Sequence, residues 1–353
     1  MHAHSISERI RQQALALGFD LVGLAPARRA EHAAALPSWL AGGCHAGMGW
    51  MARDPETRVE PARLLAGARS LVCVALAYGA EIPPPKFWDD PLRGHVARFA
   101  WGPDYHDLLA PRLEELAQFI ARDLGRPLAW KVTVDSAPLL ERDHATRAGL
   151  GFVGKSNMLV APRFGPLLLL GELLLDLELD DYDAPTPQAC CGENRCLVAC
   201  PTGALAEPFR LDARRCISWL TIENKGEIPS ELRPKIGRWI FGCDECQTSC
   251  QWPVVSSQLS DDSKLHAAFR FQPDLSTPRL DELLALDEKK FRERFGGTPL
   301  VRAKRRGLLR NAAIALGNSG LPAARPALER ATTDPEELIR THALWALQRL
   351  GSS

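Results

Sequence analysis

Residues 190–201 read CCGENRCLVACP and residues 243–250 read CDECQTSC, and these two stretches decide how the chain is organised. Each ends in two cysteines four positions apart, and Pro201 directly follows the first pair. Eight of the ten cysteines fall in this part of the chain: Cys190, Cys191, Cys196, Cys200, Cys216, Cys243, Cys246 and Cys250. Because short spacing lets several thiolates of one loop converge, the pattern predicts metal ligation.

The spacing resembles the bacterial ferredoxin run C-x-x-C-x-x-C-x-x-x-C-P, whose fourth cysteine ligates the other of two clusters. Eight thiolates are what two 4Fe-4S clusters need. Our prediction assigns one cluster to Cys200, Cys216, Cys243 and Cys246. It assigns the other to Cys196, Cys250 and the Cys190–Cys191 pair.

One position departs from this run. Glu193 lies three residues before Cys196, where the ferredoxin pattern has cysteine. Either Cys190 and Cys191 both bind, or Glu193 supplies an oxygen ligand; we favour the two cysteines because thiolate is the softer ligand. Zinc would use four ligands per site and has no need of the crossing cysteines. Disulfides fit poorly because nothing marks the chain as secreted.

Composition sets further bounds. The 353 residues carry 43 basic and 43 acidic side chains, which argues against a generally basic nucleic-acid binder but allows a local patch. The apolar run 167–179 is interrupted by Glu172, Asp176 and Glu178, so it is not expected to span a membrane. The N-terminus has no apolar signal core. We therefore expect a cytoplasmic protein with reduced cysteines and no membrane association. We also expect a monomer, although the sequence itself does not reveal the oligomeric state.

The first half alternates predicted helices and strands. A helix is expected to begin near Asp104, a good N-cap, with a buried stripe of leucines and Ile120. Strands are expected at 70–80 and 131–134, and residues 157–179 are expected to form a hairpin with PRFGP as its turn. The overall prediction is an α+β chain whose N-terminal domain, 1–180, is of the α/β type.

The remainder is predicted to contain a ferredoxin-like domain over 181–260 and a helical domain over 261–353. GLLRNAAIALGNSG (307–320) and LIRTHALWALQRLG (338–351) match at an offset of 31 residues, which resembles short HEAT-like repeats. Basic residues precede and enter the first repeat, and they predict a phosphate-binding patch: Arg302, Lys304, Arg305, Arg306 and Arg310.

Several stretches together resemble the epoxyqueuosine reductase family over nearly the whole chain. They include GFDLVGLAP (18–26), DPETRVEPARLLAGARSL (54–71), VDSAPLLERDHATRAGLGFVGKSNMLV (134–160) and the cysteine region. The resemblance implies reduction of epoxyqueuosine, at the wobble position of tRNA, to queuosine. It also implies an external electron donor, two 4Fe-4S clusters and cobalamin, and it makes tRNA the ligand of the basic patch.

The resemblance also implies roles for single residues. Asp135 would protonate the departing epoxide oxygen; the residues alone favour a different role, as the N-cap of the next helix. The cobalamin-side residues would be Arg58, Tyr105, His106, Asp135, Lys155 and Asn157. No D-x-H-x-x-G corrinoid motif is present in the sequence, so the cobalamin prediction depends on the resemblance. The alternatives are a corrinoid iron–sulfur reductive dehalogenase and a non-catalytic ferredoxin-type electron-transfer protein.

Overall fold

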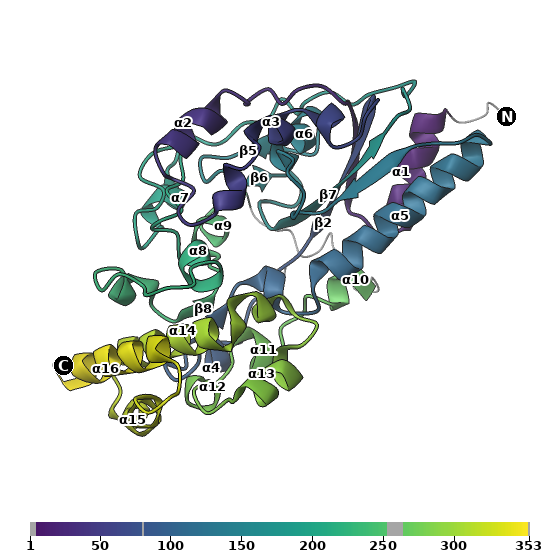
Figure 1. Cartoon of the computed structure of the whole chain (residues 1–353). Helices are drawn as coiled ribbons and strands as arrows, with labels where there is room; N and C mark the ends of the chain where they lie inside the picture. The colour runs from purple at the N-terminus through teal and green to yellow at the C-terminus, as the bar shows by residue number, and fades with distance from the viewer. Residues whose placement is uncertain (1–4, 80, 253–263, 352–353) are drawn as a thin grey trace.

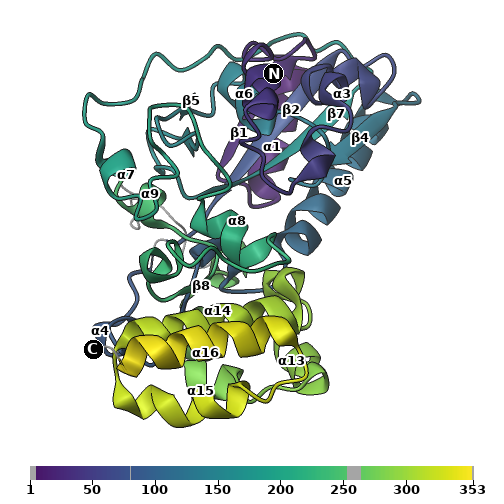
Figure 2. The ribbon, with the colours of Figure 1, turned by 60° about the vertical axis from the view of Figure 1, so that its left-hand side comes forward.

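The computed structural model describes residues 5–79, 81–252 and 264–351. A sheet with its helices forms one end of the molecule, the cysteine segment lies along one side, and the C-terminal helices form the opposite end (Figure 1). Figure 2 shows the same arrangement from a second direction. The predicted boundary between residues 260 and 261 lies outside the described residues.

The main sheet has four strands in the order β1 (Leu21–Pro26), β2 (Ser70–Ala77), β7 (Leu168–Leu175) and β4 (Trp130–Thr133). All three neighbouring pairs are antiparallel, so the N-terminal half is α+β and the α/β assignment was wrong. Strands β2 and β4 run in the same direction, but β7 lies between them. The parallel pair that a strand–helix–strand alternation suggests therefore does not form.

Each face of this sheet has its own cover. Helices α1 (Ile6–Ala16) and α5 (Tyr105–Leu124) share a core with Val72 and Val74, whereas α6 (Glu141–Arg147) shares a core with Leu71 and Cys73 on the other face. Because successive residues of β2 point to opposite faces, a strand covered on both sides reads as one continuous apolar run.

The helix expected near Asp104 is confirmed. The Asp104 side chain accepts a hydrogen bond from the His106 amide, and the predicted stripe of α5 is buried at Leu109, Leu113, Leu116 and Ile120. The predicted hairpin was wrong. Only an isolated bridge joins Ala161 to Gly165, while β6 (Leu159–Val160) pairs with β5 (Phe152–Val153) and β7 enters the main sheet.

The other elements are short in the first two thirds of the chain and longer toward its end. The first half also contains α2 (Ala35–Ala41), η1 (Gly49–Met51), α3 (Pro55–Val59), η2 (Pro61–Arg63), α4 (Pro85–Trp88), β3 (His95–Val96) and η3 (Arg98–Ala100). The cysteine segment contains α7 (Arg195–Val198), α8 (Ile217–Ile222), η4 (Arg233–Ile236), β8 (Trp239–Phe241) and α9 (Glu245–Thr248). The C-terminal part contains α10 (Lys264–Ala267), α11 (Pro273–Ser276), α12 (Leu280–Leu283), α13 (Glu288–Phe295), η6 (Pro299–Ala303), α14 (Lys304–Ser319), η7 (Pro322–Ala324), α15 (Arg325–Ala331) and α16 (Glu337–Gly351).

The two matching C-terminal sequences form α14 and α16, which lie side by side (Figure 2). Their backbones come close at Gly317, where an added Cβ would lie 2.7 Å from the Cβ of Ala346. None of the helices in the described part of the chain is long and apolar enough to cross a membrane.

Candidate active site

Asp135 lies two residues after the end of β4, and two hydrogen bonds to side chains hold it in position. Its amide donates a hydrogen bond to Oε1 of Glu141 at 2.6 Å, and the Tyr105 hydroxyl donates to Asp135 Oδ2 at 2.5 Å. The backbone of Asp135 is left-handed, with φ +55°, a conformation that costs a non-glycine residue about 1–3 kcal/mol. Helix α6 takes Leu140 as its N-cap residue, so the alternative role of Asp135 as a helix cap was wrong.

The first turn of α5 brings two more predicted residues to Asp135. His106 Nε2 lies 3.9 Å from Asp135 Oδ2 and has no hydrogen-bond partner, while its Nδ1 lies 2.8 Å from Asp104 Oδ1. Burial first, and then the Asp135 carboxylate, raise the pKa of Tyr105. The Tyr105 phenol therefore remains a hydrogen-bond donor at neutral pH.

Arg302 reaches this cluster from η6, in the C-terminal part of the chain. One of its nitrogens lies 3.1 Å from Asp104 Oδ1, and another donates to the Tyr105 hydroxyl at 3.3 Å. Burial is the largest influence and lowers the pKa of Arg302, but Tyr105, Asp104 and Asp135 outweigh it and leave that pKa raised. Arg302 thus contacts the candidate active site, a position that its sequence context among basic residues did not reveal.

Two further carboxyl groups lie behind Asp135. Glu172 is fully buried in β7, and the Thr133 hydroxyl donates to its Oε2 at 3.1 Å. Glu141 lies within hydrogen-bonding reach of Glu172. Burial raises the pKa of both groups, followed by the Asp135 charge for Glu141 and by the Glu141 charge for Glu172. Sequence reasoning missed this pair. The available signal was an acidic residue inside an otherwise apolar strand.

The remaining cofactor candidates are Arg58, Lys155 and Asn157. Arg58 donates to the Trp50 carbonyl at 3.0 Å, and its own carbonyl accepts from the Leu140 amide at 3.0 Å. Arg58 Nε and Asn157 Nδ2 are buried without a hydrogen-bond partner. Lys155, by contrast, donates to Asn194 Oδ1 at 2.8 Å and to the Gly192 carbonyl at 3.1 Å, which joins the β5–β6 turn to the cysteine loop.

The electrostatic influences among the eight cysteines group them into two sets. Burial, and then the thiols of Cys216 and Cys200 among other groups, raise the pKa of Cys246, and burial likewise raises the pKa of Cys243. The second set comprises Cys190, Cys191, Cys196 and Cys250: burial raises the pKa of Cys196 and of Cys250, and Cys190 adds to both shifts. Cys196 of the second set also acts on Cys246 of the first, so the two sets lie next to each other.

All ten cysteines are free thiols. Within the described residues, no three His, Cys, Asp or Glu side chains converge on a position for a single metal ion. The Glu193 carboxylate forms an ion pair with Arg195.

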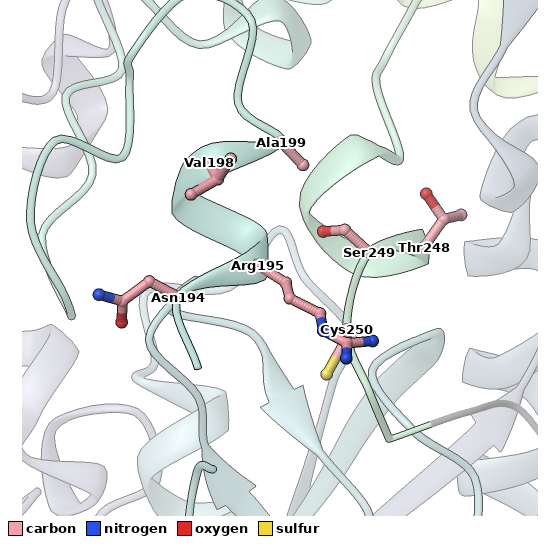
Figure 3. A pocket seen from close by; sticks show the side chains of 7 residues that line it. All are labelled: Asn194, Arg195, Val198, Ala199, Thr248, Ser249 and Cys250. Carbon is pink, nitrogen blue, oxygen red and sulfur yellow. The ribbon is translucent and has the colours of Figure 1, made fainter. Parts of the chain in front are cut away.

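A groove of about 590 Å³ lies between α7 and α9, and Cys250 of the second set borders it (Figure 3). Its lining residues are Asn194, Arg195, Val198, Ala199, Thr248, Ser249 and Cys250. The Val198 side chain is 85% exposed beside it. Cys250 of the second set therefore borders an open groove on the surface.

The predicted basic patch is only partly on the surface. Lys304 and Arg306 are exposed, and exposed Lys225 lies beside them, donating to the Arg302 carbonyl at 3.1 Å. Arg305 forms an ion pair with Asp334 in which both side chains are largely buried. Arg310 is fully buried and its assignment to the patch was wrong, because its guanidinium donates to the carbonyls of Leu220, Asn224 and Gly226.

Comparison with known proteins identifies the family of the chain. The family model described as epoxyqueuosine reductase QueG, DUF1730, matches residues 58–136, and a 4Fe-4S double cluster binding domain matches residues 189–253. An epoxyqueuosine reductase from Xanthomonas campestris pv. campestris is 41% identical, with 97% of this chain and 96% of the relative covered.

Solved structures give the same result. A crystal structure of an epoxyqueuosine reductase with an epoxyqueuosine-modified tRNA-Tyr stem loop is 34% identical, with a TM-score of 0.87, 98% of this chain and 90% of that chain covered. The Bacillus subtilis epoxyqueuosine reductase, in a structure whose catalytic aspartate loop is swung out of the active site, is 33% identical with a TM-score of 0.86. The two coverages for that structure are 97% of this chain and 90% of the other. The chain therefore belongs to the epoxyqueuosine reductase family of oxidoreductases and carries a double 4Fe-4S cluster domain.

Proposed function

We propose that this chain reduces the epoxide of epoxyqueuosine in tRNA to the alkene of queuosine, with Asp135 as the proton donor. Two electrons and two protons enter, both carbon–oxygen bonds of the epoxide break, and the oxygen leaves as water. The observation that supports the role of Asp135 is its position just after β4. Its carboxyl group accepts a hydrogen bond from the Tyr105 hydroxyl and lies beside His106. A relative's structure holds an epoxyqueuosine-modified tRNA stem loop, which supports the same substrate here.

Cobalamin is the cofactor that we propose for this site. Three of the six residues predicted for it have a buried polar atom without a protein partner: Arg58 Nε, His106 Nε2 and Asn157 Nδ2. Such atoms fit a ligand with many polar side groups, because buried polar groups normally find partners. When bound, cobalamin supplies a strongly reducing, nucleophilic cobalt centre.

The residues of the chain would then have separate roles. Arg58, His106 and Asn157 would bind and orient the cofactor, together with Tyr105 and Asp135. Lys155 would act indirectly, by holding the cysteine loop in place, because its amine already donates to Gly192 and Asn194. Asp135 would hold the proton for the departing oxygen, and the Tyr105 hydroxyl would fix the carboxyl in place.

For the clusters, we propose Cys200, Cys216, Cys243 and Cys246 as the ligands of the inner one. The outer one would take Cys190, Cys191, Cys196 and Cys250. Electrons from an external donor would enter at the outer cluster, because the groove between α7 and α9 is bordered by Cys250 and by exposed Val198.

The tRNA would contact the exposed basic residues Lys225, Lys304 and Arg306. Arg302 and Arg305, which the sequence placed in this patch, already form ion pairs with acidic groups of the protein. They would hold the patch in place and not contact tRNA themselves. With tRNA as the substrate, we expect a monomeric enzyme acting in the cytoplasm.

The decisive experiment is anaerobic reconstitution with iron, sulfide and cobalamin, followed by an assay on tRNA carrying epoxyqueuosine. The wild-type protein should form queuosine, and Asp135→Ala should lose about 10²–10⁴-fold in rate, the usual contribution of a positioned general acid. Asp135→Asn is the matched variant, since it keeps the size but not the proton. Turnover that survives both substitutions would refute the assignment.

A further inference from the structure

The Glu141 side chain contacts the backbone of the Asp135 segment. Asp135 has φ +55° and donates its amide proton to Glu141 Oε1 at 2.6 Å. Because Glu141 contacts the amide and not the carboxylate, it can act on Asp135 through geometry but cannot pass it a proton by this contact. A bond of this kind offsets part of the cost of a left-handed backbone.

Glu141 also lies within hydrogen-bonding reach of the Glu172 carboxyl group. Two carboxyl groups can form a hydrogen bond only if one of them carries a proton. Glu172 lies in the middle of the sheet, opposite Thr133 on one neighbouring strand and Cys73 on the other. The Thr133 hydroxyl donates to Oε2, whereas Oε1 of Glu172 receives no hydrogen bond.

The surroundings place the shared proton on Glu172. Burial is the largest cause that raises the pKa of Glu172, and the charges of Glu141 and Asp135 add to it. The charges of Arg142 and Arg147 act on this cluster as well, Arg142 on Glu141 and Arg147 on Cys73. The charge of Arg142 and the hydrogen bond from the Asp135 amide both favour the ionised form of Glu141.

We infer that Glu141 is a positioning residue that holds the Asp135 segment in the active site, and that the protonated carboxyl of Glu172 keeps Glu141 in place. The inference deepens the proposed function, since it takes Asp135 to be the acid. The relative from Bacillus subtilis, whose catalytic aspartate loop is swung out, shows that such a loop has a second position in that protein. In this chain, the contact with Glu141 favours the inward one.

Substitutions of Glu141 and Glu172 separate geometry from charge. Glu141→Gln keeps an oxygen that can accept the Asp135 amide proton, and its kcat should stay close to that of the wild type. Glu141→Asp keeps the charge but withdraws the carboxylate by one methylene. Its kcat should fall by up to about 100-fold, with little change in KM for tRNA, as expected for a misplaced catalytic group. Glu172→Gln can still donate to Glu141 and should be tolerated, whereas Glu172→Leu should behave like Glu141→Asp.

Two measurements need neither cobalamin nor turnover. Hydrogen–deuterium exchange of the peptide spanning residues 134–140 should be faster in Glu141→Asp than in the wild type. Exposed Glu178→Asp, which lies just beyond β7, is the matched control and should leave this exchange unchanged. Infrared spectra of the wild type should contain the carbonyl band of a protonated buried carboxylic acid, and Glu172→Gln should lack it.

The outcomes separate this inference from the proposed function. If Asp135→Ala is inactive while Glu141→Asp matches the wild type in both exchange and turnover, Glu141 has no positioning role and the proposed function stands. If Asp135→Ala remains active, the proposed function fails, and the exchange rates alone then decide whether Glu141 holds the segment. If Glu141→Asp does not fold, the infrared band decides: its persistence in Glu172→Gln would overturn the inference.

Discussion

The fourth ligand of the outer cluster depends on where single side chains point. The Glu193 carboxylate is paired with Arg195, and both side chains are more than half exposed, at 55% and 58%. Cys190 and Cys191 both act electrostatically on Cys250, which places their thiols near the proposed cluster. These contacts favour thiolate over carboxylate ligation.

We therefore expect Glu193→Ala to retain about eight irons per chain, the content of two 4Fe-4S clusters. Cys190→Ala and Cys191→Ala should each lose iron and weaken the signal of one cluster in electron paramagnetic resonance. Buried Cys44, outside the cysteine segment, provides the control: Cys44→Ala should keep full iron. Loss of a cluster in Glu193→Ala alone would assign the ligand to the carboxylate.

Single residues also show the limit of reading a sequence. The cysteine sets could be predicted because their spacing records the crossing of ligands between clusters. Arg310 could not be placed, because a run of basic residues does not show which guanidinium is buried against carbonyls. Glu172 was missed because its partner is distant in sequence. Its strand was predicted, but the neighbouring carboxyl group, that of Glu141, belongs to a helix that begins 31 residues earlier in the chain.

At the scale of elements, η6 and the start of α14 combine two different uses of positive charge. Lys304 and Arg306 are exposed, whereas Arg302 binds Asp104 and Tyr105. Lys304→Ala and Arg306→Ala should each weaken tRNA binding and reduce the slope of log affinity against log salt by about one. Arg302→Ala should instead lower turnover and leave that slope unchanged. Binding titrations over several salt concentrations, paired with turnover assays, test this. A reduced slope in Arg302→Ala would mean that Arg302 contacts tRNA phosphates.

Elements with local signals were predicted well, and those that depend on distant partners were not. Helix α5 has its own N-cap and its own apolar stripe, so its start and its buried face follow from consecutive residues. Strand β7 was assigned to the wrong partner, since a strand covered on both faces has no alternation to show which neighbours it pairs with. Its partners, β2 and β4, lie far away in the chain.

At the scale of the whole molecule, the three predicted segments share one core. Val96 and Trp101 from the first segment pack in one cluster with Phe241 from the second and Leu308 from the third. Strand β3 also pairs in parallel with β8, and Asn311 of α14 donates to the carbonyls of Thr221 and Ile240. The C-terminal helices are therefore joined to the cysteine segment by packing and by buried hydrogen bonds, and Arg302 extends this connection to Asp135.

One of these connections makes folding stability depend on pH. His342 of α16 is fully buried; its Nε2 accepts from the Ile228 amide at 3.3 Å, and its Nδ1 lies 2.7 Å from the Leu338 carbonyl. These bonds need a neutral ring, and burial lowers the pKa of His342 from 6.5 to about 4. The unfolded chain takes up this proton near its ordinary pKa, so the contribution to stability is complete above about pH 6.5 and is lost as the pH falls toward 4.

His342→Gln should remove this pH dependence. From pH 7 to pH 5, the free energy of unfolding of the wild type should fall by about 2 kcal/mol more than that of the variant, since each pKa unit corresponds to about 1.4 kcal/mol. Burial lowers the pKa of His95 and of His144 to about 4 as well, so both proteins should still lose stability in acid. Urea denaturation under anaerobic conditions, at several pH values between 5 and 7, measures the difference. Parallel curves for the two proteins would mean that the contact between α16 and Ile228 does not depend on a neutral imidazole.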